Sequence, residues 1–214
     1  MKPEKAIPIT IVSGFLGSGK TSLINHALRT DCLQCQSVLI NDYGAVKLDT
    51  HLVSPHGVVQ LIHGCICCSS RRSLPNAIKQ LITISPLPKR ILIEASSLAD
   101  PCAIRDALET SGLKTVVAVQ QIITIVAADQ ILDLKGEMAQ LAKMQLACAN
   151  LVIVNKIDLV SKEQLKRVLE VVQAVKTDIP VLTTSHGAVP TEFLQEARVQ
   201  KPIVSEEINH DSKP

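Results

Sequence analysis

The stretch GFLGSGKT, residues 14–21, decides the fold class of this chain. It follows an apolar run over residues 7–12 and precedes an amphipathic segment that begins at Ser22. Between a strand and a helix, the spacing G-x-x-x-x-G-K-[ST] is typical of a phosphate-binding loop, because glycines let successive backbone N–H groups point at phosphate oxygens. The stretch therefore predicts a nucleoside triphosphate site; the alternative is a glycine-rich turn without a ligand.

Individual positions of this loop have expected roles. Lys20 is expected to reach the β- and γ-phosphates. Thr21 is expected to offer its hydroxyl to Mg²⁺, whose remaining ligands are then mostly waters and phosphate oxygens. The predicted nucleotide-binding residues of the segment are Gly14, Gly17, Ser18, Gly19, Lys20, Thr21 and Ser22.

Strand-length apolar runs alternate with helix-period segments along most of the chain. This alternation predicts an α/β P-loop NTPase fold, with a doubly wound, mainly parallel sheet and helices on both faces. Ligands in such sheets bind at the carboxyl ends of the strands. The runs cover residues 7–12, 37–40, 58–62, 90–94, 115–119, 122–126, 151–154 and 181–182, and the helical segments cover 21–29, 73–83, 102–110, 137–147 and 162–175.

The 214 residues suffice for one α/β domain with a large core. We expect this P-loop GTPase domain over residues 6–187, followed by a C-terminal helix or tail over 188–214 and no separate C-terminal domain. Apolar residues make up 46% of the sequence and aromatic residues 1%, so the core is expected to consist of Ile, Leu, Val and Ala. Aromatic platforms for stacking nucleic acid bases are lacking.

The net charge of +2 is small, and the basic residues are scattered along the chain. This pattern supports neither a nucleic acid nor an anionic membrane as partner. No apolar run approaches the roughly 18 residues of a membrane-spanning helix, because Gln120, Gln121 and Asp129 interrupt the most apolar region. Residues 1–5 lead directly into the phosphate loop, so removal of a signal peptide would destroy the motif. We therefore expect a cytoplasmic protein.

The sequence NKID, residues 155–158, follows the apolar run over residues 151–154. The Asp158 carboxylate can accept from both N1–H and the exocyclic amine of guanine, while Asn155 can meet O6 or N7. Adenine lacks that pair of donors. An ordinary helix-capping turn is the alternative for so short a pattern. The predicted guanine-binding residues are Asn155, Lys156 and Asp158, with Ser185 and His186 covering the base from the other side unless they form only a glycine turn.

Carboxylates follow two of the predicted strands. Glu94 ends the run over residues 90–94, where it can hold Mg²⁺ through water or orient the attacking water. A helix-capping role fits Asp100 better than Glu94. The sequence NDYG, residues 41–44, ends the second strand, where a loop that senses the triphosphate would lie. Asp42 and Asp49 are candidate Mg²⁺ contacts, and the candidate catalytic residues are Lys20, Glu94 and Asp42.

The seven cysteines are an odd number, and in a cytosolic nucleotide-binding protein they are expected to be reduced. This state favours metal or redox chemistry over disulfides. The sequence GCICC, residues 64–68, can supply up to three soft ligands to Zn²⁺, completed by a histidine, a carboxylate or water. Cys65, Cys67 and Cys68 are therefore the candidate zinc ligands; the alternative is that they are inert core residues.

The other cysteines carry weaker signals. Cys32 and Cys35 have metal or redox spacing, but they lie in a loop away from the carboxyl ends of the strands. Cys102 and Cys148 fall within helical segments and are expected to be packing residues. The six histidines form no motif with ligand spacing.

Taken together, the motifs resemble those of the CobW branch of the UreG/HypB/CobW family of P-loop GTPases, which act as metal chaperones and metal-insertion regulators. The resemblance implies GTP hydrolysis to GDP with Mg²⁺ and a Zn²⁺, Co²⁺ or similar ion on the cysteine cluster. It also implies a client apo-metalloprotein as partner and homodimerisation through the nucleotide face. The resemblance rests on GFLGSGKT (14–21), NDYG (41–44), GCICC (64–68), EASSLADP (94–101) and NKID (155–158).

Several positions depart from the family pattern. Ala45 replaces a glutamate that usually follows the NE-aromatic-Gly element, and Asp42 replaces the glutamate inside it. Ser97 stands where the family has the glycine that reports the γ-phosphate, and a serine disfavours positive φ. Two further acidic positions correspond to Ala127 and Asn150. These changes predict slow hydrolysis and blunted switching.

Three functions remain open at this point. The first is a slow GTPase that couples its nucleotide state to transition-metal binding and delivery. The second is a nucleotide-dependent regulator or scaffold with little or no turnover, motivated by Ala45 and Ser97. The third is a small-molecule kinase, which the NKID sequence and the lack of an arginine-rich lid disfavour.

Overall fold

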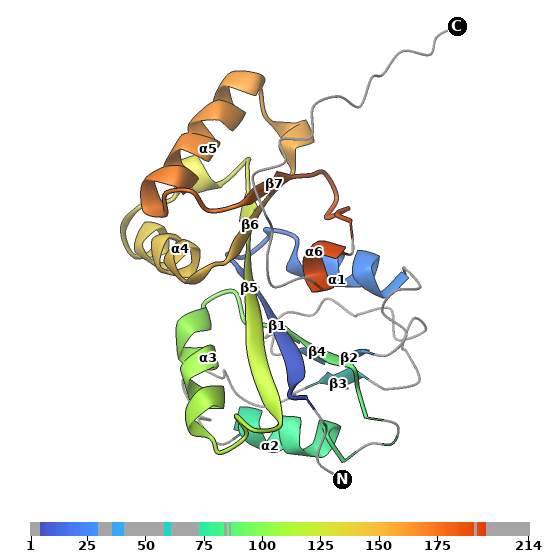
Figure 1. Ribbon diagram of the computed structural model, residues 1–214. Helices are drawn as coiled ribbons and strands as arrows, with labels where there is room; N and C mark the ends of the chain where they lie inside the picture. The colour runs from blue at the N-terminus through green and yellow to red at the C-terminus, as the bar shows by residue number, and fades with distance from the viewer. Residues whose placement is uncertain are drawn as a thin grey trace, which may run out of the picture.

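The computed structural model describes residues 5–29, 36–40, 58–60, 73–83, 85, 87–190 and 192–195. A seven-stranded sheet forms its centre, in the strand order β3-β2-β4-β1-β5-β6-β7 (Figure 1). Each neighbouring pair is parallel, so the strand ends that carry the predicted motifs share one edge. The predicted P-loop α/β fold is confirmed. The strands are β1 (Ile7–Gly14), β2 (Gln36–Ile40), β3 (Val58–Gln60), β4 (Arg90–Glu94), β5 (Val117–Ala127), β6 (Leu151–Asn155) and β7 (Val181–Thr183).

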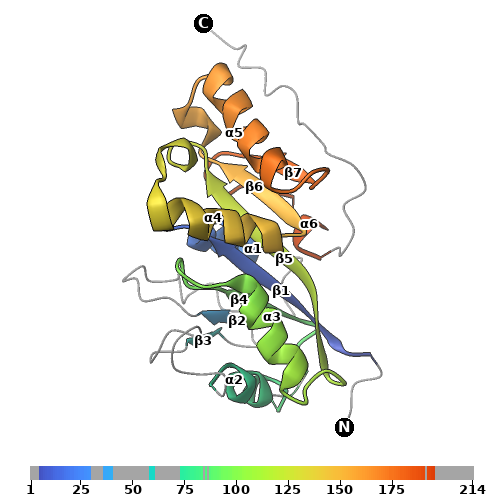
Figure 2. The same ribbon diagram turned by 90° about the vertical axis from the view of Figure 1, so that its left-hand side faces the viewer.

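Helices cover both faces of the sheet. They are α1 (Lys20–Arg29), α2 (Ser73–Leu81), α3 (Pro101–Thr110), α4 (Gly136–Cys148), α5 (Lys162–Val175) and α6 (Glu192–Gln195), with short 3-10 turns η3 (Ile131–Asp133) and η4 (Ile157–Leu159). Helices α2 to α5 lie on one face, and α1 and α6 lie on the other (Figures 1 and 2). Ile11 packs toward α2 and α3, whereas its neighbour Val12 packs toward α1, because side chains alternate along a strand. In the described part of the chain, the residues of the buried hydrophobic core are Ile, Leu, Val and Ala, as expected.

Strand β5 corrects the prediction of two separate strands over residues 115–119 and 122–126. It runs without a break, and its register against β1 shifts so that Ile9 pairs with Val119 and Thr10 with Gln121. Gln120 is therefore an extra residue, as in a β-bulge. Gln121 is buried and its Nε2 donates to the carbonyl oxygen of Phe193 at 3.0 Å. A polar residue does not end this strand because a distant segment accepts a hydrogen bond from its side-chain Nε2.

The short helix α6 is tied to the sheet through side chains of β1 and β5. Besides the Gln121 bond to Phe193, Thr10 Oγ1 donates to the carbonyl oxygen of Leu194 at 3.2 Å. Thr10 Oγ1 also accepts from Arg90 Nη1 at 3.1 Å, and burial of this guanidinium lowers the pKa of Arg90. Arg90 begins β4, so this network lies at the amino end of the strand, opposite the edge that carries the motifs.

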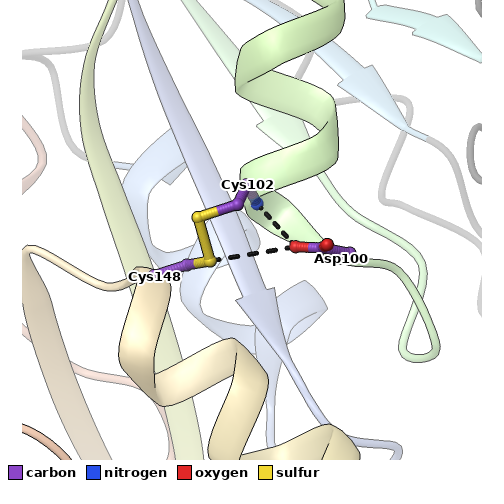
Figure 3. Close-up of side chains that lie close together, drawn as sticks. All are labelled: Asp100, Cys102 and Cys148. Carbon is purple, nitrogen blue, oxygen red and sulfur yellow. Dashed lines mark hydrogen bonds between the residues drawn. A yellow bond between two sulfur atoms is a disulfide. The ribbon is translucent and has the colours of Figure 1, made fainter.

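Cys102 and Cys148 are joined by a disulfide that links the start of α3 to the end of α4, with their Cα atoms 5.7 Å apart (Figure 3). The expectation of reduced packing cysteines is wrong for this pair. The two residues are 46 positions apart, and their proximity follows from the packing of α3 against α4. Among the residues that the structure describes, no helix is both long and apolar enough to span a bilayer.

Candidate functional site

The phosphate loop forms between β1 and α1 as a tight backbone curl. Gly14 and Gly19 both have positive φ, at 143° and 102°. A Cβ at Gly14 would collide with the carbonyl oxygen of Ile125, and a Cβ at Gly19 would collide with the side-chain amide of Asn155. Ser18 is 1% exposed, and its hydroxyl oxygen has no hydrogen-bond partner in the described part of the chain. The loop thus holds a buried polar atom that a ligand can satisfy.

Lys20 is buried, with 5% of its surface exposed, and its ammonium group is held by the protein. The Nζ atom donates to the carbonyl oxygens of Gly14 at 3.0 Å and Phe15 at 3.3 Å. It also donates to Ser97 Oγ at 2.8 Å, which connects the phosphate loop to the segment after β4. A buried ammonium needs such partners, and a phosphate oxygen would compete for the same donors.

A hydroxyl–carboxylate pair lies beside this lysine. Thr21 Oγ1 donates to Glu94 Oε1 at 2.8 Å, and Glu94 is 1% exposed. The two residues come from neighbouring elements because β1 pairs in parallel with β4, placing Val12 opposite Glu94. Magnesium prefers hard oxygen donors of this kind. Thr21 and Glu94 therefore fit the predicted Mg²⁺ position by their chemistry and burial.

Asn155 connects three loops at the other end of the site. Its side chain is buried, with Nδ2 donating to the Ser18 carbonyl at 2.9 Å and Oδ1 accepting from the Gly187 N–H at 3.0 Å. The sequence assigned Asn155 to the guanine base, and that contact stays a prediction. The observed bonds give it a second role, since they fasten the phosphate loop to the turn after β7.

The remaining residues of the predicted base site lie in the segments that follow β6 and β7. Lys156 adopts a left-handed conformation with φ 62°, and its Nζ lies 3.2 Å from Asp129 Oδ2. Asp158 is exposed in η4, and His186 is exposed with φ 58° in the turn after β7. The backbone at Gly187 packs so tightly on α1 that a Cβ there would come 2.8 Å from Leu23 N. Ser185 is half-buried in the same turn.

Gln145 belongs to the site but was missed by the sequence analysis. It is 1% exposed on α4, and its Nε2 donates to the backbone carbonyls of Ser97 at 3.0 Å and Ala99 at 3.1 Å. Thr124 Oγ1 in turn donates to the Gln145 carbonyl at 2.9 Å. Gln145 therefore fixes the backbone of the segment whose Ser97 hydroxyl contacts Lys20. No motif includes it; its one signal is a polar residue among the buried positions of α4, next to Leu146.

Several predicted site residues lie outside the described residues. They include the sensor-loop carboxylates and both cysteine clusters. They are Asp42, Asp49, Cys65, Cys67 and Cys68, together with Cys32 and Cys35.

The model of the CobW/HypB/UreG nucleotide-binding domain family matches residues 8–183. The chain belongs to this family. The resemblance seen in the sequence is thereby confirmed for the domain that contains the phosphate loop and NKID.

Curated relatives in this family carry names that refer to zinc. The chain is 28% identical to the zinc chaperone CobW of Pseudomonas aeruginosa, over 91% of this chain and 60% of that protein. It is also 28% identical to zinc-regulated GTPase metalloprotein activator 1 of Saccharomyces cerevisiae, over 89% of this chain and 51% of that protein. The chain thus spans about half to three fifths of the length of these two relatives.

Solved structures show the same fold at lower sequence identity. The Zn(II)-bound YjiA GTPase from E. coli matches with a TM-score of 0.68 and 20% identity, covering 97% of this chain and 68% of that one. HypB from Helicobacter pylori in complex with nickel matches with a TM-score of 0.59 and 20% identity, covering 90% of this chain and 83% of that one. These likenesses concern the arrangement of strands and helices.

Proposed function

We propose that this protein binds guanine nucleotide, hydrolyses GTP slowly to GDP and phosphate, and couples its nucleotide state to binding and delivery of a transition metal, with zinc as the first candidate. The observation that carries the nucleotide part is the adjacent pair of contacts Lys20–Ser97 and Thr21–Glu94. They place an ammonium group, a hydroxyl and a carboxylate beside one glycine-rich loop. The metal part rests on the cysteine cluster and on the zinc named in the relatives.

Lys20 would hold the β- and γ-phosphates. In the described state its donors are used by two loop carbonyls and by Ser97 Oγ. Arrival of a triphosphate would give Lys20 anionic acceptors, which form stronger hydrogen bonds than a neutral hydroxyl does. We infer that Lys20 then exchanges Ser97 for phosphate oxygen, while the two backbone carbonyls keep its chain oriented.

Thr21 and Glu94 would hold Mg²⁺, the hydroxyl as a ligand and the carboxylate through water. When bound, Mg²⁺ neutralises negative charge on the phosphate oxygens. The protein's part is to keep the half-buried Thr21 and the buried Glu94 together beside the phosphate loop, and in that position Glu94 can also orient a water molecule. Asp42 and Asp49 are proposed to complete this set from the sensor loop.

Ser97 is the proposed link between the two activities. Its side chain contacts Lys20, and its backbone carbonyl is held by Gln145. We propose that release of the Ser97 hydroxyl from Lys20 leaves the segment 95–100 held by Gln145, and that the segment then shifts in a nucleotide-dependent way. We propose that this change reaches the cysteine loop, so that Cys65, Cys67 and Cys68 bind Zn²⁺ with different affinity in the GDP and GTP states.

The nucleotide part is tested with Lys20→Ala. We expect GTP hydrolysis to fall by about 100-fold or more, because the variant loses the cation that stabilises charge on the transferred phosphoryl group. Single-turnover release of inorganic phosphate measures the loss. Lys143→Ala is the matched control, since Lys143 is exposed on α4. Equal rates for both variants, or label transferred to an added acceptor instead of water, would contradict the proposal.

The metal part is tested by competition between the reduced protein and a chromophoric zinc chelator, with Mg²⁺-GDP or with a non-hydrolysable GTP analogue. We expect two Zn²⁺ affinities that differ by about fivefold or more between the nucleotide states. The triple variant Cys65→Ser, Cys67→Ser, Cys68→Ser is expected to lose this difference. Indistinguishable affinities in the two nucleotide states would exclude coupling.

A second candidate function is a nucleotide-dependent regulator with almost no turnover. The observation that favours it is the Ser97 hydroxyl bonded to Lys20, which is an internal competitor for the phosphate-binding cation. Tight GTP binding with hydrolysis at the background rate, unchanged by Lys20→Ala, would favour this function over a GTPase cycle.

We propose the cytoplasm as the location and a client apo-metalloprotein or a second copy of this chain as protein partner. Leu16 in the phosphate loop is 66% exposed and Leu98 in the segment after β4 is 58% exposed. Two large apolar side chains on the loops that flank the phosphate site support a protein contact at this edge. Size-exclusion chromatography with GDP and with a GTP analogue distinguishes a second copy from a client.

A further inference from the structure

Asp100, Cys102 and Cys148 form a cluster of ligand atoms away from the predicted zinc loop. One carboxylate oxygen and the two sulfur atoms all lie within 4.8 Å of one another. Asp100 and Cys102 stand at the start of α3, and Cys148 is the last residue of α4 (Figure 3). All three residues are half-buried, so they remain within reach of small ions and reductants.

We propose that the reduced thiols of Cys102 and Cys148, together with the Asp100 carboxylate, form a second binding site for a thiophilic divalent metal such as Zn²⁺. The disulfide is the oxidised state that closes this site. The inference does not depend on the GCICC loop. Cys102 and Cys148 have no part in the proposed GTPase cycle, whereas Asp100 ends the segment 95–100 that is proposed to change with the nucleotide state.

The distances in the cluster suit one ion. Zinc–sulfur bonds of about 2.3 Å at a tetrahedral centre separate two sulfur ligands by roughly 3.8 Å. Cys148 Sγ already lies 3.8 Å from Asp100 Oδ1. The Cα atoms of the two cysteines are 5.7 Å apart, so opening the S–S bond to a sulfur separation of roughly 3.8 Å needs side-chain rotation with little backbone movement.

Asp100 is held in place by α3 itself. It is the N-cap residue, and its Oδ1 accepts from the backbone N–H of Cys102 at 2.8 Å. A ligand carboxylate that also accepts a hydrogen bond has a fixed orientation, as is usual around protein-bound metals. The N-cap hydrogen bond therefore fixes the Asp100 carboxylate beside Cys102, with Oδ1 within 3.8 Å of Cys148 Sγ.

The two helix ends also suit the charges of a metal site. Cys102 lies in the first turn of α3, where the positive end of the helix dipole stabilises a thiolate. Cys148 ends α4, where the negative end of the dipole favours a cation. Three protein ligands leave the fourth tetrahedral position open for water or for a ligand from another molecule. Such an open site suits a metal ion that is bound and later released.

The redox step balances with a dithiol as the named reductant. The dithiol breaks the S–S bond, delivers two electrons and two protons to the sulfurs, and becomes a cyclic disulfide. Binding of one Zn²⁺ then releases the two thiol protons to solvent. Reoxidation needs a two-electron acceptor, and the cyclic disulfide of the oxidised dithiol can serve: it takes two electrons from the two thiolates and two protons from solvent, the Cys102–Cys148 bond re-forms, and Zn²⁺ is released.

The test uses the full chain with Cys32, Cys35, Cys65, Cys67 and Cys68 all changed to Ser, which leaves Cys102 and Cys148 as the two cysteines. Zn²⁺ is titrated against a chromophoric chelator after dithiol reduction and again after oxidation, with the dithiol removed before each titration. We expect one Zn²⁺ per reduced chain and at least tenfold weaker binding by the oxidised chain. Co²⁺ in place of Zn²⁺ should give thiolate-to-metal charge-transfer absorption in the reduced chain alone.

Asp100→Asn is the variant that isolates the carboxylate. Asparagine is also a good N-cap, so α3 keeps its start while the ligand charge is lost. We expect about tenfold weaker Zn²⁺ binding, whereas Asp106→Asn, which changes an exposed carboxylate on the same helix, should leave the affinity unchanged.

Two results would overturn the proposal: no Zn²⁺ bound by the reduced five-serine chain, or equal affinity for Asp100→Asn and Asp106→Asn. Circular dichroism of each variant confirms that the chain is folded. GDP binding by the five-serine chain tests the nucleotide site separately, so failure here leaves the proposed GTPase function intact.

Discussion

The phosphate end and the base end of the site are held together in different ways. At the phosphate end, Lys20 bonds to Ser97 and Thr21 bonds to Glu94, and a nucleotide with Mg²⁺ would use these same donors and acceptors. At the base end, Asn155 bonds to backbone groups of Ser18 and Gly187, which no ligand has to displace. We therefore expect one end to exchange contacts on nucleotide binding and the other to keep them.

This difference gives mutations at the two ends opposite expected effects. Loss of a contact that a ligand must displace should favour the nucleotide-bound state, because the competing interaction is gone. Loss of a contact that persists should lower the stability of the free protein and of its nucleotide complex alike.

The largest effect is expected for Asn155→Ala. The substitution leaves the Gly187 N–H and the Ser18 carbonyl without their partner, so the free energy of unfolding should fall by about 1–3 kcal/mol even without nucleotide. Affinity for GDP should fall by about tenfold or more, since the loops lose their connection. Urea unfolding and binding of a fluorescent GDP measure the two quantities. Asn76→Ala, at an exposed position of α2, is the control. Unchanged stability would show that the base end is not fixed by this amide.

A smaller effect of opposite sign is expected for Ser97→Ala. Without the hydroxyl, the phosphate no longer competes with Ser97 for the Lys20 ammonium group. GTP affinity should therefore rise by about three- to tenfold, which corresponds to the free energy of about one hydrogen bond. Fluorescent GTP analogue binding measures it. Ser96→Ala is the matched control because Ser96 is similarly buried in the same segment. A fall in affinity for Ser97→Ala alone would mean that the hydroxyl contacts the nucleotide. Ser97→Gly adds backbone freedom, and any further gain in hydrolysis rate measures that contribution.

The smallest effect is expected for Asp129→Asn. Lys156 Nζ and Asp129 Oδ2 are 3.2 Å apart, and 26% of each side chain is exposed. Solvent-accessible ion pairs of this kind contribute about 0–1 kcal/mol to stability. GDP affinity should change less than about fivefold, and the change should shrink as salt is raised. Titration of fluorescent GDP at two salt concentrations checks this, with Asp133→Asn as the exposed control. A larger or salt-independent change would place Asp129 among the residues that fix the base end.

Local patterns predicted most of the fold. Neighbouring residues carry these patterns, as in the glycine spacing of residues 14–21 and the apolar runs ahead of Glu94 and Asn155. The predicted strand ends and helix starts therefore lie within a few residues of the observed ones. The roles of Asp158, His186 and the cysteines of the GCICC loop stay predictions.

The features that were missed depend on residues far apart in the chain. Gln121 continues β5 because its partner is Phe193, 72 positions away. Cys102 meets Cys148 because two helices pack side by side, and Gln145 reaches the segment after β4 for the same reason. None of these contacts leaves a spacing pattern in the sequence, because each is decided by the tertiary arrangement.

The bonds from Thr10 and Gln121 to α6 bear on where the folding unit ends. One side-chain donor from each of two central strands, Thr10 Oγ1 and Gln121 Nε2, is accepted by a backbone carbonyl at residue 194 or 193, beyond the last strand. A chain shortened to residue 187 would keep all seven strands and the nucleotide loops, yet two buried side chains would lose their acceptors at a cost of about 1–3 kcal/mol each. In energetic terms, the domain extends past its sheet to the short helix that closes over it.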